Sequence, residues 1–446
     1  MGHGSPLKNI LKTSIPAVVD LSSQTIMFTI EAIFIGRIST AAFAGQGLAI
    51  QVVIAFLTIL ITFIVGSSLI VARHLGADER REANHVFGQA LMISIVISFV
   101  FAIVWYFGAV QLFKLIKEGG SVEAQQAGSS YLRIVALFAP IIITNFTAVG
   151  VIRGAGDTHL SMIVNVIING LNLILAPLLI FGWFGFPRWE VEGAAMALGI
   201  SHSVGFLATL YILRTRKSVL FLSFRELTKP NFKTFKRLLN AGIPTTIEQL
   251  VWALGLLVVS IYAARLGEKY LAAHIVLNRI QNILSMAYLG FSLAAMTLMG
   301  KNLGAEKQKL AERTAKTAGW VGFIFSFVVA ITMITFSKSI LYLFTPEPSV
   351  ITIGVHAMII FAIVQIPKAV DNVIIGNLRG AGDLKWLMYM TIIGVFFLEV
   401  CLNWVVAFKT TLALLGLWSV HLLDETLRLV VNYWRFKGGR WKLMKV

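Results

Sequence analysis

The pentapeptide Arg153–Asp157 (RGAGD) occurs a second time as Arg379–Asp383, and each copy stands between two long apolar runs. A shift of about 226 residues maps the first copy onto the second. Other landmarks keep nearly the same offset, and they are Ile15-Pro16 with Ile243-Pro244, Asp20 with Glu248, Arg37 with Arg265, and Leu75–Ala77 with Leu303–Ala305. The chain therefore consists of two related halves, with a period far longer than that of solenoid repeats.

The composition is that of an integral membrane protein. Of the 446 residues, 57% are hydrophobic and 13% are charged, and the mean hydropathy of +0.82 exceeds that of soluble globular domains. Several apolar runs without a formal charge have about the length that an α-helix needs to cross roughly 30 Å of hydrocarbon. These runs are 48–72, 86–109, 160–180 and 317–336.

Several classes of function are disfavoured by what the sequence lacks. The formal net charge of +17 would suit nucleic acid only on a water-facing domain, and the basic residues fall in loops between apolar runs, so no nucleic-acid partner is expected. The single Cys401 excludes an intrachain disulfide, and no cleavable-signal pattern opens the chain. No GxxxxGK[ST], HExxH, GxSxG or CxxC motif is present, so we expect neither an ATPase nor another enzyme, and no cofactor.

We predict an all-α membrane protein with twelve transmembrane helices in two parallel six-helix repeats. An N-terminal lobe spans 1–213, a cytoplasmic basic linker 214–237 and a C-terminal lobe 238–446. The predicted helices lie near 12–36, 46–72, 86–110, 131–152, 160–182, 193–213, 240–264, 274–299, 315–337, 351–378, 386–407 and 412–434.

The distribution of basic residues predicts the orientation. The linker carries eight Lys and Arg against one acid, Glu226. With the linker and both termini inside, the inner loops hold 26 Lys/Arg and the outer loops 9, so the positive-inside rule places both termini in the cytoplasm of a multi-pass plasma-membrane protein. An even number of helices per half makes the repeats parallel, an arrangement that suits alternating access between two lobes.

Polar residues inside the first and fifth predicted helices form two stripes. The first stripe is Asp20, Gln24 and Glu31, and the second is Asn165, Asn169 and Asn172. Each set shares one helix face, because positions i, i+4 and i+11 of the first stripe, like i, i+4 and i+7 of the second, lie close together on a helical wheel. The stripes could meet, with Asn145 of the fourth helix completing a site where a carboxylate ringed by amides binds a proton or sodium. The alternative is hydrogen bonding that only joins the helices.

The second half carries several further intramembrane charges, which by default face a cavity or a partner. Glu248 stands beside Gln249 and Trp252 with no cation at helical spacing before Arg265, which favours a functional role. Asp371 has Lys368 three residues earlier, so pairing and function are both open. Asp424 and Glu425 precede Arg428 and indicate a structural ion pair, and the role of Glu399 is open. We expect Arg279 to be buried, and we expect the intramembrane histidines, His421 among them, to serve packing or interhelical bonding.

Taken in order, the landmarks resemble those of the multidrug and toxic compound extrusion (MATE) transporters over almost the whole chain. Each stretch is weakly specific alone, and their order and spacing make the set specific. The stretches are Arg153–Asp157, Asn169, Asn172, Leu178–Gly182, Gly242–Gln249, Leu271–His274, Arg279-Ile280, Leu378–Asp383, Leu415–Trp418 and Arg435-Phe436.

This resemblance implies two six-helix lobes around a central cleft and efflux of bulky organic cations against inward sodium or proton flow. It also implies roles for Glu31 and Glu248 in coupling or substrate binding, and it matches Gln24 and Asn172 to polar positions of the N-lobe cation site. The chain departs from the family where Leu175–Pro177 replaces an Asp-containing tripeptide, where Glu31 replaces Asp, and where Lys368 stands at an acidic position. These departures favour Glu248 for substrate or coupling.

We therefore predict a monomeric secondary antiporter in the lipid bilayer that exports organic cations in exchange for sodium or protons. The predicted coupling-ion residues are Glu31, Gln24, Asn169, Asn172 and Asp371, with Glu31 the candidate sodium ligand. The predicted substrate-binding residues are Glu248, Gln249, Trp252 and Asn145. The alternatives are a flippase for a lipid-linked precursor, which a cleft with several arginines would favour, and a passive channel.

Overall fold

The computed structural model describes residues 5–115 and 121–444, and the ordered segments within these ranges are helices joined by short turns. Lys445, part of the predicted basic C-terminal tail, lies outside the described residues. Within these ranges, eleven helices are long and apolar enough to cross a membrane. A twelfth long helix, α15, carries more charge, and the all-helical membrane fold is confirmed.

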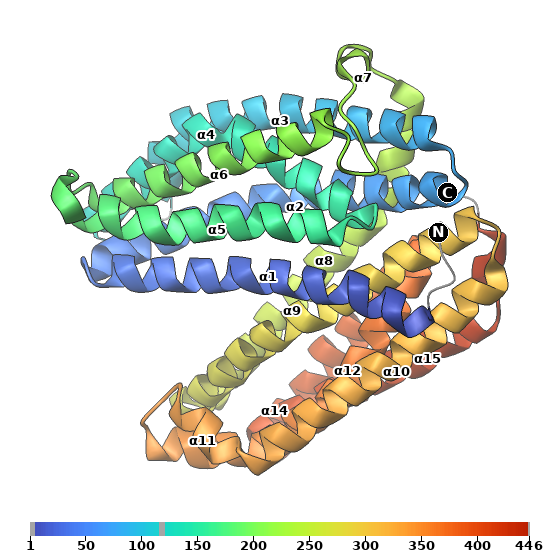
Figure 1. The fold of residues 1–446 in the computed structure, drawn as a ribbon. Helices are drawn as coiled ribbons and strands as arrows, with labels where there is room; N and C mark the ends of the chain where they lie inside the picture. Colours follow the sequence, from blue (N-terminus) through green and yellow to red (C-terminus); the bar gives the residue numbers. More distant parts are fainter. Residues whose placement is uncertain (1–4, 116–120, 445–446) are drawn as a thin grey trace. The chain divides into compact units, whose positions relative to one another are not determined.

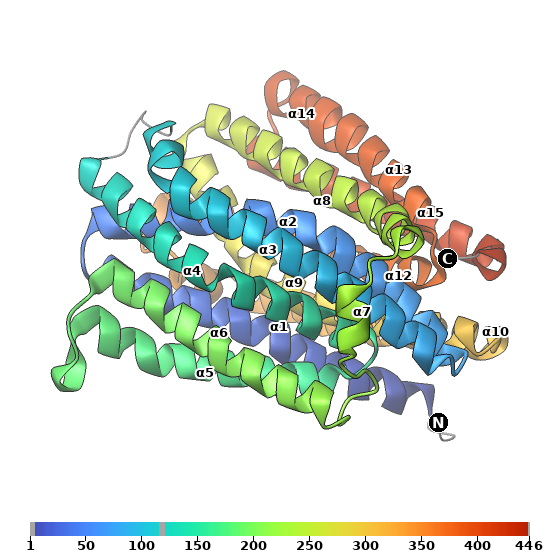
Figure 2. The same ribbon diagram turned by 90° about the horizontal axis from the view of Figure 1, so that it is seen from above.

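Every predicted helix is present, and most are longer than predicted because their ends continue into polar sequence. The long helices are α1 (Pro6–Gly36), α2 (Thr40–Gly76), α3 (Arg80–Leu115), α4 (Val122–Gly154), α5 (Thr158–Phe181), α6 (Glu190–Arg214), α8 (Phe232–Leu266), α9 (Glu268–Gly304), α10 (Gln308–Thr335), α12 (Pro348–Ala381), α13 (Leu384–Gly394) continued by η2 (Val395–Leu402) and α14 (Asn403–Lys409), and α15 (Ala413–Lys437). Figures 1 and 2 show α5 and α6 side by side, joined by a short connection.

Each RGAGD copy forms the same turn between two helices. Gly156 and Gly382 have φ of +92° and +91°, a left-handed conformation that L side chains rarely adopt. The amide of Asp157 donates to the carbonyl of Ile152 at 3.1 Å, and that of Asp383 donates to Leu378 at 2.9 Å. The duplicated sequence therefore encodes a duplicated backbone conformation.

A pair of glycines four residues apart precedes each turn. Gly376 and Gly380 of α12 approach the backbone of α9 at Ser292 and Met296 so closely that a Cβ atom at either position would collide with a carbonyl oxygen. The corresponding Gly150 and Gly154 of α4 face side chains of α2. Small residues at this spacing let two membrane helices pack backbone to backbone.

The described chain divides into two compact units. The N unit is Val19–Gly242, and the C unit is Met1–Val18 with Ile243–Val446. The division falls inside α1 and α8, because Ile10 packs with Ala295, Ala318 and Val373 of the C unit. The predicted lobe boundaries at 213 and 238 remain a prediction. The division between the two compact units is a different one, and it falls within two continuous helices.

The segment predicted as a basic linker is ordered against the N unit. It contains the short helix α7 (Phe224–Thr228), and Gln89 of α3 donates to the carbonyls of Glu226 and Lys229, both at 2.9 Å. His85 of α3 bonds to the Glu226 carboxylate. The expectation of a simple hydrated linker is therefore incomplete, because polar side chains of α3 bind its backbone.

Candidate functional site

The two predicted stripes of the N unit meet along α1 and α5. Asn169 Nδ2 donates to Ser23 Oγ at 2.8 Å. Asn172, with its NH₂ group turned toward the carboxylate, donates to Glu31 Oε2 at 3.3 Å. The pairs along this interface are Asn165 with Asp20, Asn169 with Ser23, and Asn172 with Glu31. One line of hydrogen bonds thus joins α1 to α5, because the three asparagines, at i, i+4 and i+7, share one face of α5.

Glu31 is a buried carboxylate that is surrounded by uncharged donors. It is 1% exposed, and Gln46 Nε2 lies 2.7 Å from its Oε1. Tyr131 donates to the same oxygen at 3.5 Å. Within residues 5–115 and 121–444, Glu31 has no ion pair. Such a carboxylate can accept a proton or coordinate sodium with amide and hydroxyl oxygens nearby.

Asp20 lies on the same stripe but carries a permanent partner. Arg153 Nε lies 3.1 Å from its Oδ2, and Ser161 and Asn165 also donate to this carboxylate. Arg153 Nε contacts Ser161 Oγ at 3.1 Å as well. The arginine of the first RGAGD copy therefore neutralises Asp20.

The other two predicted residues of this unit have separate environments. Gln24 is half-buried on the stripe and has no hydrogen bond to any part of the chain that the structure describes. Asn145 is 1% exposed and accepts a hydrogen bond from Thr209 Oγ1 of α6 at 2.7 Å. The structure thus joins Asn145 to α6 and records no bond from it to Glu31.

Glu248 in the C unit is paired, which corrects the expectation that it stands alone. Arg379 Nη2 donates to its two oxygens at 2.9 and 3.0 Å. Spacing within one helix could not reveal this partner, because Arg379 lies 131 residues away on α12. Asp20 with Arg153 and Glu248 with Arg379 are therefore the same ion pair in both repeats.

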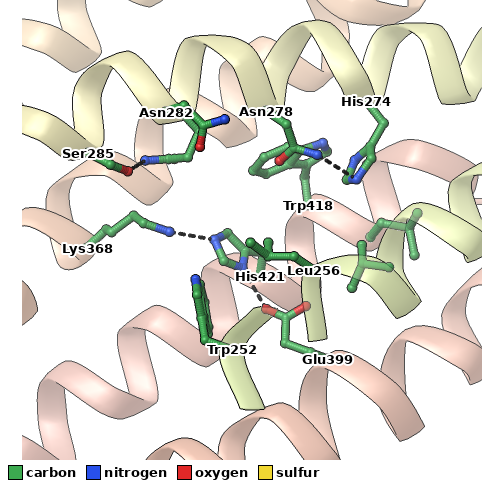
Figure 3. A pocket seen from close by; sticks show the side chains of 13 residues that line it. Trp252, Leu256, His274, Asn278, Asn282, Ser285, Lys368, Glu399, Trp418 and His421 are labelled. Atoms are coloured by element: carbon green, nitrogen blue, oxygen red, sulfur yellow. Dashed lines mark hydrogen bonds and ion pairs between the residues drawn. The ribbon is translucent and has the colours of Figure 1, made fainter. Parts of the chain in front are cut away.

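A second set of charges forms a chain of contacts in the C unit (Figure 3). Lys368 Nζ lies 3.1 Å from His421 Nε2, a contact drawn in Figure 3, and 2.9 Å from Glu425 Oε1. His421 Nδ1 lies 2.6 Å from Glu399 Oε1, whose other oxygen accepts from Asn403 at 2.9 Å. Glu399 stands on the π-helical segment η2, and wider turns of this kind are frequent at functional sites.

These contacts identify the partners of the charges in the second half. Lys368 pairs with Glu425 rather than with Asp371, which accepts from Asn432 Nδ2 at 2.9 Å. Asp424 pairs with Arg428 at 2.9 Å, as predicted. Glu399, His421 and Asp424 bring one ligand atom each within 4.8 Å of one another, so this group could hold a cation.

A cavity of about 90 Å³ lies beside this network and is large enough for several water molecules. Lys368, Glu399 and His421 reach its wall, as Figure 3 shows. Trp252 and Trp418 supply aromatic faces. Polar groups also line it, and they include Asn278, Gln281, Asn282 and Ser285.

Two cations contact the ring of Trp252. Lys368 Nζ is 5.2 Å from the centre of its ring, and Arg428 Cζ is 4.8 Å from it. Two polar atoms of wall residues, His274 Nδ1 and Trp418 Nε1, are buried without a hydrogen-bond partner in the described chain. The cavity therefore combines aromatic surface, charge and unused polar atoms, which suits a small polar ligand with an apolar part.

Two further predictions can be compared with the structure. Gln249 is exposed rather than buried beside Glu248. Arg279 is also exposed, so the expectation that it is buried is wrong. The residue lies about 100° around α9 from the cavity-lining Asn278, which turns it off the face that carries the other polar residues.

The chain resembles transporters over nearly its full length. A model of the MatE family matches residues 16–178 and 244–405, one segment in each repeat. The probable multidrug resistance protein NorM of Thermotoga maritima is 27% identical over 438 residues, which cover 98% of this chain and 93% of that relative. The uncharacterized transporter YisQ of Bacillus subtilis is 25% identical over 429 residues, which cover 96% of this chain and 93% of that relative.

A solved structure supports the same fold. A MOP superfamily transporter from Pyrococcus furiosus, described as having a binding pocket of reverse polarity, matches with a TM-score of 0.88. The match covers 98% of this chain and 97% of that one at 24% sequence identity. At this identity the likeness shows the fold alone.

Proposed function

The chain belongs to the MATE family of transporters, and on this premise we propose that it is a secondary antiporter that exports small organic cations in exchange for sodium ions or protons. It is a multi-pass membrane protein of a transporter family and not an enzyme. The names of relatives such as the Thermotoga protein support multidrug efflux as its activity.

The observation that carries the proposal is the environment of Glu31. A carboxylate that is 1% exposed and bonded by Gln46 and Tyr131 keeps its negative charge uncompensated by any cation in the described chain. Burying such a charge without a partner costs several kcal/mol, so binding a proton or sodium ion is favourable. We assign coupling to Glu31 together with Gln24, Asn169, Asn172 and, in the C unit, Asp371.

We assign substrate binding to Glu248, Gln249, Trp252 and Asn145. Trp252 follows Glu248 by one helical turn and lines the cavity, and its ring already holds the cations Lys368 and Arg428. An organic cation would bind this ring by replacing one of them. Glu399 lines this cavity, and the buried carboxylates of the network and its neighbours, Glu399, Glu425, Asp424 and Asp371, outnumber the permanent cations Lys368 and Arg428. This excess of negative charge favours a cationic ligand.

Coupling follows from competition for the carboxylates. In a low-dielectric interior one negative group cannot hold two cations without strong repulsion. Occupation by the coupling ion therefore lowers the affinity for the organic cation, and the reverse holds equally. Alternation of access then exchanges one species for the other across the membrane.

Uptake of a fluorescent organic cation into proteoliposomes, with sodium and proton gradients imposed separately, tests this proposal. We expect one gradient to drive uptake by the wild type and Glu31→Gln to reduce that uptake to the level of empty liposomes, because the amide cannot bind the ion as a carboxylate does. Glu268→Gln, which removes an exposed acid, is the matched control and should transport normally.

Other results would overturn the antiporter. Movement that follows only the gradient of the compound itself would indicate a channel. Absence of transport for every cation, by a protein that remains folded, would indicate a lipid-linked substrate and thus a flippase. Full gradient-driven uptake by Glu31→Gln would remove Glu31 from the coupling site.

A further inference from the structure

A second pocket lies at the end of α6, away from the residues assigned to transport. It has a volume of about 590 Å³, and it is formed by the last turns of α6 and the segment that follows. Arg214 and Arg216 line it together with Tyr211 and Phe221, and leucines complete the wall. All of these residues belong to the N unit.

The positive charge at this pocket is not neutralised. Arg214, Arg216 and the adjacent Lys217 are exposed, and none of them has an acidic partner in residues 5–115 and 121–444. Arg216 adopts a φ of +56°, and its guanidinium lies 5.0 Å from the centre of the Phe221 ring. Lys217 Nζ lies 3.3 Å from the hydroxyl of Tyr211. The local fold thus gathers three cations around an open pocket.

In the second repeat, an arginine near the end of the last long helix is neutralised by an acid. Asp383, the last residue of the second RGAGD copy, accepts from Arg435 near the end of α15 at 2.7 and 3.2 Å. In the first copy, Asp157 instead accepts from Ser218 and from the amide of Val219. The equivalent acid therefore anchors the loop and leaves Arg214, the last residue of α6, and Arg216 of the following segment available for a ligand.

An apolar surface leads along α6 to the pocket. Val204, Leu207 and Tyr211 share one face of the helix, and their exposed fractions are 39%, 65% and 58%. In a membrane protein such a face contacts lipid chains. We propose that the pocket binds the headgroup of an anionic phospholipid, with the phosphate held by Arg214 and Arg216 and the acyl chains along this face of α6.

The chemistry of the residues selects this ligand. Guanidinium groups bind phosphate oxygens through paired hydrogen bonds, and three unneutralised cations favour a headgroup with net negative charge. Basic pockets at the cytoplasmic surface suit anionic lipids, which are enriched there, and the predicted orientation places the end of α6 on that side. The inference does not depend on the transported compound or on the coupling ion.

Native mass spectrometry of the full chain in detergent, titrated with phosphatidylglycerol or phosphatidylcholine, tests the site. We expect the wild type to retain phosphatidylglycerol preferentially, and Arg214→Gln/Arg216→Gln to lower the apparent affinity about tenfold. Lys233→Gln/Lys236→Gln removes the same charge from two exposed positions of α8 and should leave the affinity unchanged. Arg214→Lys/Arg216→Lys, which keeps the charge and loses the paired geometry, should show a smaller loss.

Three results would overturn the proposal. Equal losses in the two glutamine variants would show attraction to diffuse charge rather than to a site. Equal retention of the two lipids would remove the selection for an anionic headgroup. Displacement of phosphatidylglycerol by inorganic phosphate at matched concentration would identify a site for a free anion instead.

Discussion

The two RGAGD copies hold the same ion pair, but the polar groups around these pairs differ between the repeats. Arg153 binds Asp20 in the N unit, and Arg379 binds Glu248 in the C unit. Glu31, in contrast, maps onto apolar sequence near Leu257 in the second half. The duplicated ion pairs belong to the architecture of each half. Residues without a counterpart, such as Glu31, are the positions at which the two halves can differ in binding.

The C unit contains the larger set of unduplicated charges. With the same shift, Lys368 maps onto Ile142 and Asp371 onto Asn145. Among the described residues, the N unit thus keeps one buried carboxylate without an ion pair, Glu31, among neutral donors, whereas the C unit holds a connected network beside a cavity. This contrast favours a small ion for the first site and a larger cation for the second.

The largest expected effect comes from breaking either duplicated pair. Arg153→Leu and Arg379→Leu each leave a buried carboxylate without its cation, and we expect each to lower the free energy of unfolding by about 3–5 kcal/mol. Equilibrium unfolding in mixed micelles measures the loss. Equal losses would support an equivalent structural role, and a loss in only one variant would break the comparison.

Removing both charges of each pair separates stability from transport. Asp20→Asn/Arg153→Gln and Glu248→Gln/Arg379→Gln should each recover most of the stability, because no unpaired charge stays buried. We expect transport to be lost only in the second, since Glu248 is one turn from the cavity-lining Trp252. Normal transport by that variant would remove Glu248 from the substrate site.

A smaller difference is expected at the paired glycines. At position 376 an added methyl group meets the backbone of Ser292, whereas at position 150 it meets a side-chain methyl of Ile64 at 2.8 Å. A side chain can rotate and a helix backbone cannot, so Gly376→Ala should cost about 1–3 kcal/mol and Gly150→Ala less than about 1 kcal/mol. The same unfolding measurement checks both, and equal costs would show that the repeats pack alike.

The helices and the N-unit stripe could be predicted because their signals are local. Apolar runs of membrane length predict helices, and the i, i+4, i+7 spacing predicts which side chains share a face. The spacing predicted that the two stripes could meet, as Asn172 and Glu31 do, but it did not predict Ser23 as the partner of Asn169. Most helices are longer than predicted, because their polar terminal turns, which lie beyond the hydrocarbon, do not differ in hydropathy from loops.

The charge network of the C unit could not be predicted in this way. Lys368 and Glu425 lie on different helices, so helical spacing offered only Asp371 as a partner for the lysine. The Glu248 partner, however, was encoded in the duplication, because Asp20 maps onto Glu248 and Arg153 onto Arg379. One known pair in the first repeat would have predicted the second.

The smallest expected effect distinguishes the last residues of the two RGAGD copies. Asp383→Asn removes a charge-assisted pair with Arg435 and should cost about 1–2 kcal/mol. Asp157→Asn should cost less than about 1 kcal/mol, because the amide oxygen can still accept from Ser218 and Val219. Unfolding of the two variants side by side measures the difference. Equal costs would mean that Asp157 also stabilises nearby positive charge, and Arg214 and Arg216 would then be less available to a lipid phosphate than the geometry indicates.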